Sequence, residues 1–264
     1  MMNGERPQMI SRPMMLNVLT AAILMWAPSA AAQRTCDPPV PGLRNRSEVS
    51  LFVSGFWSSS EKFTQSSVSH QNYHEMTNHT FPAIFAGLRV EEARVADDGA
   101  AERTLHVQFV SHRYFDVLGI SAAMGRTFDG NDDRPEDKPA VAVISDQLWL
   151  SMFYLDPRVV GRRMKVNGRR VTIVGVAPSG FYGVLQTAEE TLWLPGASMP
   201  GANTRGSEGY THFVVTLGDD IRWDDARRYF GTLPSLLAKA FPDVNQKFKA
   251  VGFYDLGLLA CPSR

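Results

Sequence analysis

The sequence predicts an α+β fold, in which a split α/β lobe built from two strand-helix-strand units carries an inserted, mostly β subdomain. Three observations support this prediction. A strand-helix-strand pattern runs up to Val110, a second one begins near Thr211, and the stretch between them has short apolar runs separated by Gly, Pro and Asp. With 264 residues, 44% of them hydrophobic, the chain can bury one large core or two small ones.

The first unit combines one helix with three strands. Alternating apolar residues predict a strand over Glu48–Ser54, closed by Gly55-Phe56-Trp57. A helix is expected over Ser69–Asn78, with Ser69 as its candidate N-cap. Two further strands are predicted over Ile84–Ala93 and Thr104–Val110, joined by a tight turn at Asp97-Asp98-Gly99.

The middle of the chain carries the clearest local signals. A brief helix is predicted over Asp146–Phe153, behind Ser145. Asn167-Gly168 predicts a hairpin between strands Arg163–Val166 and Arg169–Val174, because both turn positions need positive φ. Strand alternation then places Met164 and Val166 on one face and Arg163 and Lys165 on the other.

The second unit repeats the pattern of the first. A strand is predicted over Phe213–Leu217 and another over Phe248–Tyr254. Between them, apolar residues recur at three and four positions and predict a helix after Asp219-Asp220. Pro234 lacks an amide and crowds the carbonyl of Phe230, so a kink or two shorter helices are expected.

The N-terminus is typical of a targeting segment. Arg6 and Arg12 precede the apolar run Met14–Ala27, and Ala30-Ala31-Ala32 offers a small-residue cleavage site before Gln33. Residues 1–32 are therefore either a cleaved signal peptide or an N-terminal anchor through residues 14–32, a length close to the roughly 20 residues that span a bilayer. Both alternatives predict a periplasmic or extracytoplasmic location.

Charge and cysteine content exclude several function classes. Lys plus Arg and Asp plus Glu are equal at 27 each, so no overall field favours nucleic acid. Cys36 and Cys261 are the only cysteines, and they form either one long-range disulfide or two free thiols. No phosphate-binding loop motif and no Gly-x-Ser-x-Gly motif occurs in the sequence, which argues against ATP hydrolysis and serine hydrolase chemistry.

Several short motifs occur in a specific order between about Ser69 and Tyr254. They are Tyr114-Phe115-Asp116-Val117-Leu118-Gly119, Gly125-Arg126-Thr127-Phe128, Val141–Ile144, Leu148-Trp149, Asp156-Pro157, Val160-Gly161, Asn167-Gly168, Val174-Gly175-Val176-Ala177-Pro178 and Leu192-Trp193-Leu194-Pro195. In this order they resemble the MacB-like periplasmic core domain of ABC transporter permeases, in the FtsX-like permease family.

The resemblance implies a non-catalytic core module, not an enzyme, with a binding or coupling role and no cofactor. Its expected partners are a transporter ATPase–permease complex or a periplasmic adaptor protein. Family members have three further membrane helices after this domain, and no apolar segment long enough follows Ala32. We therefore expect a truncated permease, a gene fragment or a freestanding relative that cannot transport alone.

The resemblance also implies a division of the chain. The expected parts are residues 1–32 as the targeting segment, 33–68 as a leading segment with the first strand, 69–110 as the first part of the α/β lobe, 111–205 as the inserted β-rich subdomain, 206–257 as the second part of the lobe, and 258–264 as a tail.

A second hypothesis comes from the histidines of the first predicted helix. His74-Glu75 with His79 nearly matches the zinc-protease motif, but His79 is five residues on and falls off the face that His74 occupies. His70 and His74 are four apart and share a face, so the alternative function is a secreted metal-dependent hydrolase using these two histidines and a distant carboxylate. The favoured interpretation is that they are solvated helix histidines and that no metal site exists.

Two charged segments have comparable interpretations. Asp129, Asn131 and Asp133 have the spacing of the first EF-hand ligands, but the required Gly and Glu are replaced by Arg134 and Ala140, which favours a solvated polar loop. A set of basic residues on the predicted hairpin either binds an acidic partner or is simply the solvated face of the hairpin. Its members are Arg162, Arg163, Lys165, Arg169 and Arg170.

Overall fold

A computed structural model describes residues 49–57, 63–78, 83–97, 100–134, 140–185, 188–217, 221–245 and 252–260. All of them belong to one compact unit, Thr35–Arg264, and the remaining unit is Met1–Arg34. The predictions for the targeting segment, the two cysteines and His79 lie outside the described residues. Among the helices described, none combines the length and apolar character needed to cross a membrane.

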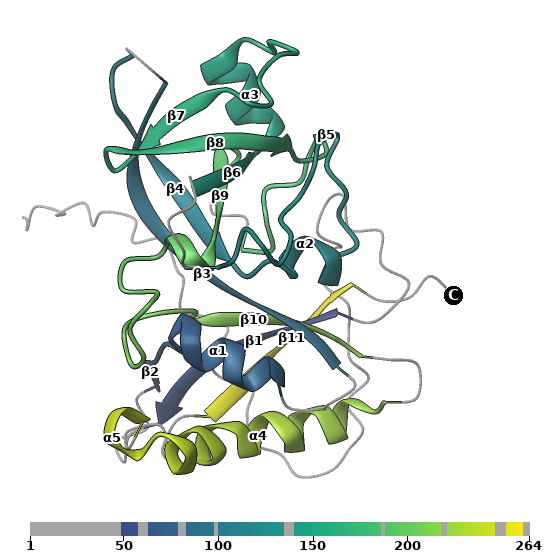
Figure 1. Ribbon diagram of the computed structural model, residues 1–264. Helices are drawn as coiled ribbons and strands as arrows, with labels where there is room; N and C mark the ends of the chain where they lie inside the picture. The colour runs from purple at the N-terminus through teal and green to yellow at the C-terminus, as the bar shows by residue number, and fades with distance from the viewer. Residues whose placement is uncertain are drawn as a thin grey trace, which may run out of the picture. The chain divides into compact units, whose positions relative to one another are not determined.

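Strands dominate the described part of the chain (Figure 1). They are β1 Val49–Trp57, β2 Phe63–Gln65, β3 Ala83–Asp97, β4 Arg103–Val110, β5 Met124–Gly125, β6 Ala140–Ile144, β7 Arg163–Val166, β8 Arg169–Val176, β9 Thr191–Pro195, β10 His212–Leu217 and β11 Gly252–Ala260. The helices are α1 His70–Asn78, α2 Tyr114–Val117, α3 Asp146–Phe153, α4 Trp223–Ala240 and α5 Pro242–Asn245, with a 3₁₀ turn η1 at Gly196–Ser198. The α+β class is confirmed.

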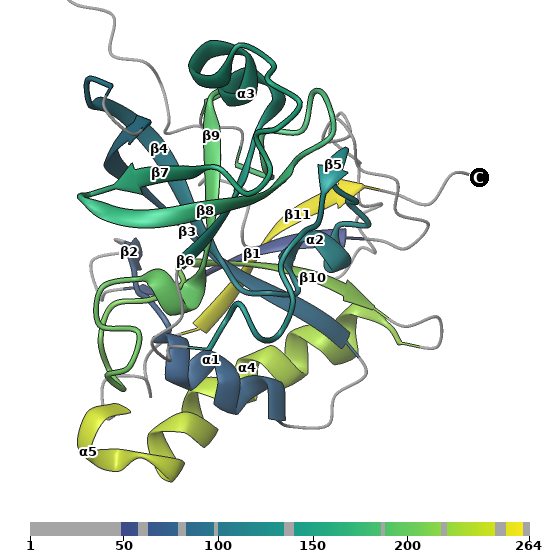
Figure 2. The same cartoon turned by 45° about the horizontal axis from the view of Figure 1, so that its top comes forward.

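The strands form one hydrogen-bonded sheet in the order β11-β1-β10-β3-β4-β9-β6-β8-β5, with β2 on β1 and β7 bridging β3 and β8. Strand β3 is the reason for this continuity, because its first half pairs with β10 and its last residues pair with β7. Figure 2 shows β3 running from the strands near α4 to those near α3. The expected division into a lobe and a separate insert is therefore not confirmed, since the sheet crosses the expected boundary.

The sheet has a hydrophobic core on each face. Neighbouring residues of a strand enter opposite cores, as Phe213 and Val214 do on β10, and as Leu192 and Trp193 do on β9. Helices α1, α3 and α4 pack into the first core and α2 into the second. In Figures 1 and 2, α1 and α4 lie side by side on the same face of the sheet.

Most local predictions are confirmed, with shifted ends. The Ser69 hydroxyl accepts the amide of Asn72 at 3.3 Å, and the Ser145 hydroxyl accepts the amide of Leu148 at 3.1 Å, so both serines cap their helices. Strands β3 and β4 begin before the predicted residues, and β1 continues through Gly55–Trp57, which was expected to close it.

The hairpin of β7 and β8 has the predicted turn. Asn167 and Gly168 have φ of 47° and 77°, the left-handed conformations that this turn type requires. Met164 and Val166 are buried, whereas Arg163 is exposed. The hairpin prediction is therefore confirmed in its turn and in its faces.

Two predictions near the C-terminus are wrong in detail. Two shorter helices around Pro234 are wrong, since one helix, α4, runs through the proline and its buried stripe stays on the sheet, whereas a kink at this residue stays a prediction. Strand β11 begins at Gly252 and runs to Ala260, so residues 258–260 belong to the sheet and not to a tail. They pair with β1, Leu258 opposite Ser50 and Ala260 opposite Val49.

Candidate functional site

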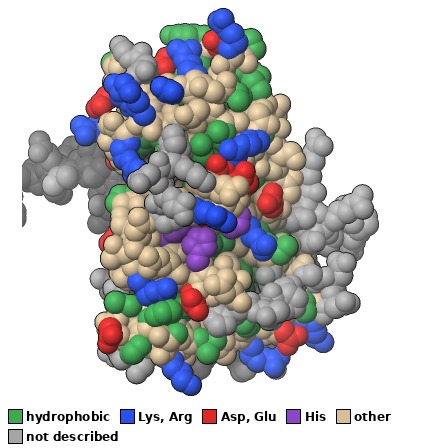
Figure 3. Space-filling model, viewed as in Figure 1, with side chains coloured by type: hydrophobic (Ala, Val, Ile, Leu, Met, Phe, Trp, Pro, Cys, Tyr) green, Lys and Arg blue, Asp and Glu red, His purple; other side chains and the backbone are tan. Residues whose placement is uncertain are grey.

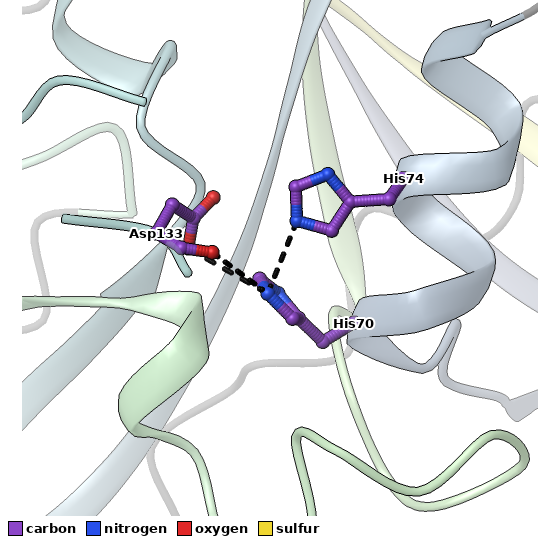
Figure 4. A group of neighbouring side chains, drawn as sticks. All are labelled: His70, His74 and Asp133. Carbon is purple, nitrogen blue, oxygen red and sulfur yellow. Dashed lines mark hydrogen bonds and ion pairs between the residues drawn. The ribbon is translucent and has the colours of Figure 1, made fainter. Parts of the chain in front are cut away.

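The most chemically distinctive group of side chains lies between α1 and the loop after β5. His70 and His74 are one turn apart on α1 and project from the same face toward Asp133 (Figure 4). Their Nε2 atoms are 3.1 Å apart, and Nε2 of His70 lies 3.9 Å from Oδ1 and 3.2 Å from the carbonyl oxygen of Asp133. One donor atom from each residue fits within a span of 4.8 Å.

Asp133 is held in place by several donors. Its Oδ2 accepts the amide of His112 at 3.1 Å and lies 3.3 Å from the Nδ1 atom of the same residue. Its Oδ1 accepts the amide of Ala197, in η1, at 3.1 Å. The carboxylate is fully buried, and these hydrogen bonds offset the cost of its desolvation. The aspartate thus joins the loop after β5 to η1.

His70 is oriented from its other side by Tyr210. The Nδ1 atom of His70 lies 3.0 Å from the Tyr210 hydroxyl, and both residues are buried. Glycines make room for the tyrosine, because a Cβ at Gly196 would lie 1.7 Å from its hydroxyl and one at Gly87 would lie 2.5 Å from its ring. Tyr210 therefore fixes the plane of the His70 ring, as outer partners of metal-binding histidines do.

Burial sets the protonation state of the two histidines. Desolvation lowers the pKa of His70, and the negative charge of Asp133 opposes this effect only in part. Desolvation and the neighbouring His70 lower the pKa of His74. Both rings are consequently neutral near pH 7, and a neutral imidazole has a lone pair that can bind a metal.

The sequence interpretation of this region needs correction. His70 is 1% exposed and His74 is half-buried, so the prediction of solvated helix histidines is wrong for His70. His70 is buried because the face of α1 that carries Tyr73 and Met76 packs on the sheet, and His70 lies next to this face. The apolar residues Tyr73 and Met76 were the signal in the sequence that could have indicated the burial of His70.

The acidic loop also differs from its prediction. Asp129 and Asn131 are exposed, as expected of a solvated loop, but Asp133 is 1% exposed. Asp132 accepts bonds from Arg126 and from the amide of Asp129, which closes the loop on itself. The segment with EF-hand spacing is thus a turn, and the carboxylate at its third position, Asp133, faces the two histidines instead of its own loop.

The predicted basic set is only partly available to a partner. Arg163, Arg169 and Arg170 are exposed. Arg162 pairs with Asp97 at 2.5 Å and lies 3.7 Å from Asp156, so part of its charge is neutralised within the chain.

A second distinctive surface, which the sequence analysis missed, lies at the end of α3. Leu150, Tyr154, Leu155 and Val160 are exposed by 48%, 87%, 48% and 38%, and we call them the α3-tip surface. Figure 3 shows hydrophobic side chains gathered at the top of the molecule, over α3, and histidine side chains open to the surface near its centre. No signal in the sequence indicated that these apolar residues are uncovered.

Comparisons with known proteins agree with this fold. The profile of the MacB-like periplasmic core domain matches residues 46–233. The periplasmic region of MacB from Actinobacillus actinomycetemcomitans superposes with a TM-score of 0.56 at 14% identity, covering 78% of this chain and 89% of that chain. The extracellular domain of the noncanonic ABC-type transporter YknZ from Gram-positive bacteria gives 0.55 at 14% identity, covering 78% and 98%.

At this identity the superpositions show a shared fold alone. No curated protein matches the sequence significantly. The profile match, by contrast, spans well over half of the chain. The chain therefore belongs to the MacB-like periplasmic core domain family.

Proposed function

We propose that this chain is a non-catalytic, extracytoplasmic module of an ABC transporter permease system that binds a partner protein through the α3-tip surface. Family membership supports the setting, since the two superposed structures are periplasmic or extracellular regions of transporters. The observation that carries the binding role is the group of four exposed apolar side chains on α3 and in the turn after it. Exposed apolar clusters of this kind mark interaction sites.

The α3-tip surface is presented by a rigid turn. Tyr154 and Leu155 have φ of 52° and 58°, in the left-handed region that is unfavourable for side chains of this size. The turn is held by the amide of Leu155, which donates to the carbonyl of Trp149 at 3.3 Å, and by the Trp149 indole, which donates to the carbonyl of Asp156 at 2.9 Å. A rigid aromatic residue loses little conformational entropy on binding, which favours Tyr154 as an anchor.

Charge around this surface indicates the chemistry of the partner. Arg158 is 89% exposed, and its guanidinium lies 3.3 Å from Asp156, which is 25% exposed. Arg162 also lies at this end of α3, with its guanidinium 5.2 Å from the centre of the Phe153 ring. An apolar centre with an arginine rim complements a partner surface that has an apolar centre and acidic residues around it.

The alternative of a metal-dependent hydrolase has less support. His70 and Asp133 are both buried, so neither side chain reaches a substrate directly. The hollows described in the structured residues lie elsewhere. One hollow, of about 340 Å³, is bordered by Arg89, Glu208 and His212.

Site-specific photo-cross-linking in cells that make the protein tests this function. A benzophenone amino acid at Tyr154 is expected to give a discrete adduct with one envelope protein. The same probe at Leu236, an exposed leucine on α4, is the matched control and is expected to give none. Arg158→Glu and Leu155→Ser should each lower the adduct yield by about tenfold, because anchor residues at interfaces contribute about 1.4 kcal/mol or more. Equal labelling from both positions would refute the proposed surface.

A further inference from the structure

We infer that His70, His74 and Asp133 form a binding site for one divalent transition-metal cation of the zinc class, and that the bound cation fastens α1 to the loop after β5. Two imidazole nitrogens and a carboxylate oxygen are donors that zinc accepts. This site is separate from the α3-tip surface and does not depend on the proposed function.

The distances fit such a site. In a tetrahedral zinc centre with bonds of about 2.0–2.1 Å, the ligand atoms lie about 3.3 Å from one another. The Nε2 atoms of His70 and His74 are 3.1 Å apart, and Oδ1 of Asp133 is 3.9 Å from Nε2 of His70. Shifts of a few tenths of an ångström in each side chain satisfy these two separations. The third, between His74 and Asp133, is within 4.8 Å, so a movement of about 1.5 Å or less brings it to the same value. His74 is half-buried, which leaves room for water as the fourth ligand.

The surroundings hold two of the ligands before any cation arrives. The Tyr210 hydroxyl lies 3.0 Å from Nδ1 of His70, and when Nδ1 carries the ring proton, the lone pair of Nε2 faces His74 and Asp133. The amides of His112 and Ala197 fix the Asp133 carboxylate. A site whose ligands are already positioned loses less conformational entropy on binding.

The three ligands come from two distant parts of the chain, α1 and the loop after β5. His70 and Asp133 are separated by 63 positions, and between them the chain forms β3, β4, α2 and β5. In the described residues, α1 contacts this loop through His70, whose Nε2 lies 3.2 Å from the carbonyl oxygen of Asp133. A cation would add bonds from both histidines and the aspartate, which would stiffen this connection.

Zinc titration tests the site directly. The protein, prepared without a polyhistidine tag and freed of metal by a chelator, is titrated with Zn²⁺ by calorimetry and with Co²⁺ by visible absorption. One equivalent is expected to bind, with the absorption bands of four-coordinate Co²⁺. At a Zn²⁺ concentration about 100 times Kd, Tm should rise by about 5 °C or more.

Variants separate this site from adventitious binding. His74→Gln is expected to keep the fold, since His74 is half-buried, and to weaken Zn²⁺ binding by at least about 100-fold, because even outer partners cost 10–100-fold. Asp133→Asn should do the same, and if it fails to fold, His74→Gln alone decides. His106→Gln, a half-buried histidine on β4, is the control and should bind like the parent. The inference is wrong if the parent binds no better than His74→Gln, or if Co²⁺ shows no four-coordinate bands.

Discussion

Asp133 offers the sharpest test of how the loop after β5 is held, and the effect can be measured without any metal. Its buried carboxylate accepts two backbone amides, those of His112 and Ala197, at 3.1 Å each. Alanine in its place removes both acceptors and leaves two partly buried N–H groups without partners. Asparagine keeps one acceptor oxygen, but turns an amide NH₂ toward a backbone N–H.

The size of the loss follows from these bonds. Hydrogen bonds to a charged group contribute about 1.5–3 kcal/mol each, so Asp133→Ala should lower the free energy of unfolding by about 3–5 kcal/mol. Asp133→Asn should lower it by about 1–3 kcal/mol, because a single acceptor is lost. A domain with roughly 5–15 kcal/mol of stability would lose a large fraction of it in the alanine variant.

Urea denaturation followed by tryptophan fluorescence, in the presence of a chelator, gives the assay. The midpoint should fall while the slope m stays constant, since the folded and unfolded states keep their exposed areas. Asp116→Ala, an exposed aspartate on α2, is the matched control and should change stability by less than about 0.5 kcal/mol. A loss below about 1 kcal/mol for Asp133→Ala, or an equal loss for both variants, would refute the reasoning.

Three further predictions concern pH, backbone space and a buried amide. Burial lowers the pKa of His212 to about 4. Between pH 6.5 and pH 4 the unfolded chain therefore binds a proton that the folded chain does not, and the free energy of unfolding should fall by roughly 3 kcal/mol across this range. His212→Gln should remove this part of the pH dependence in denaturation curves. Gly175→Ala should destabilise the fold by about 3 kcal/mol, since its Cβ would lie 2.1 Å from the carbonyl oxygen of Arg126. Gly231→Ala in α4 meets nothing within 4 Å and should stabilise the fold by about 0.5–1 kcal/mol. Thermal melts that gave both variants the same sign would contradict this. Gln108→Leu should cost about 1–3 kcal/mol, because the buried Trp193 indole donates to its Oε1 at 3.1 Å, and an unchanged urea midpoint would show that the bond does not stabilise the fold.

Local chemistry explains why certain elements could be predicted from the sequence. The turn at Asn167-Gly168 depends on two residues that tolerate positive φ, and the helix behind Ser145 depends on one hydroxyl that accepts an amide three residues on. Both signals are local, and distant segments then add to them: Asn167 accepts the amide of Arg94, and the Ser145 hydroxyl donates to the carbonyl of Glu189. The family motifs work in the same way, because they are short and keep their order along the chain.

Only the histidine pair of the candidate metal site could be predicted from the sequence, and its carboxylate could not. The spacing of His70 and His74 places both on one face of α1, and this was apparent from the sequence. Their third partner, Asp133, follows α1 by more than fifty positions and lies in a loop that resembles a failed calcium site. Which carboxylate meets the pair depends on how the loop after β5 folds back over α1, and nothing local to either segment determines that.

The sequence by itself determined the α+β class, the two capped helices, the hairpin and the family, because each depends on backbone preferences and ordered short motifs within a few residues. Only the tertiary structure decided that one sheet joins both expected lobes through β3, that residues 258–260 pair with β1, and that His70 and Asp133 are buried together. The physical reason is that burial and strand pairing are properties of two segments in contact. A residue's own neighbours in sequence cannot specify what lies across from it.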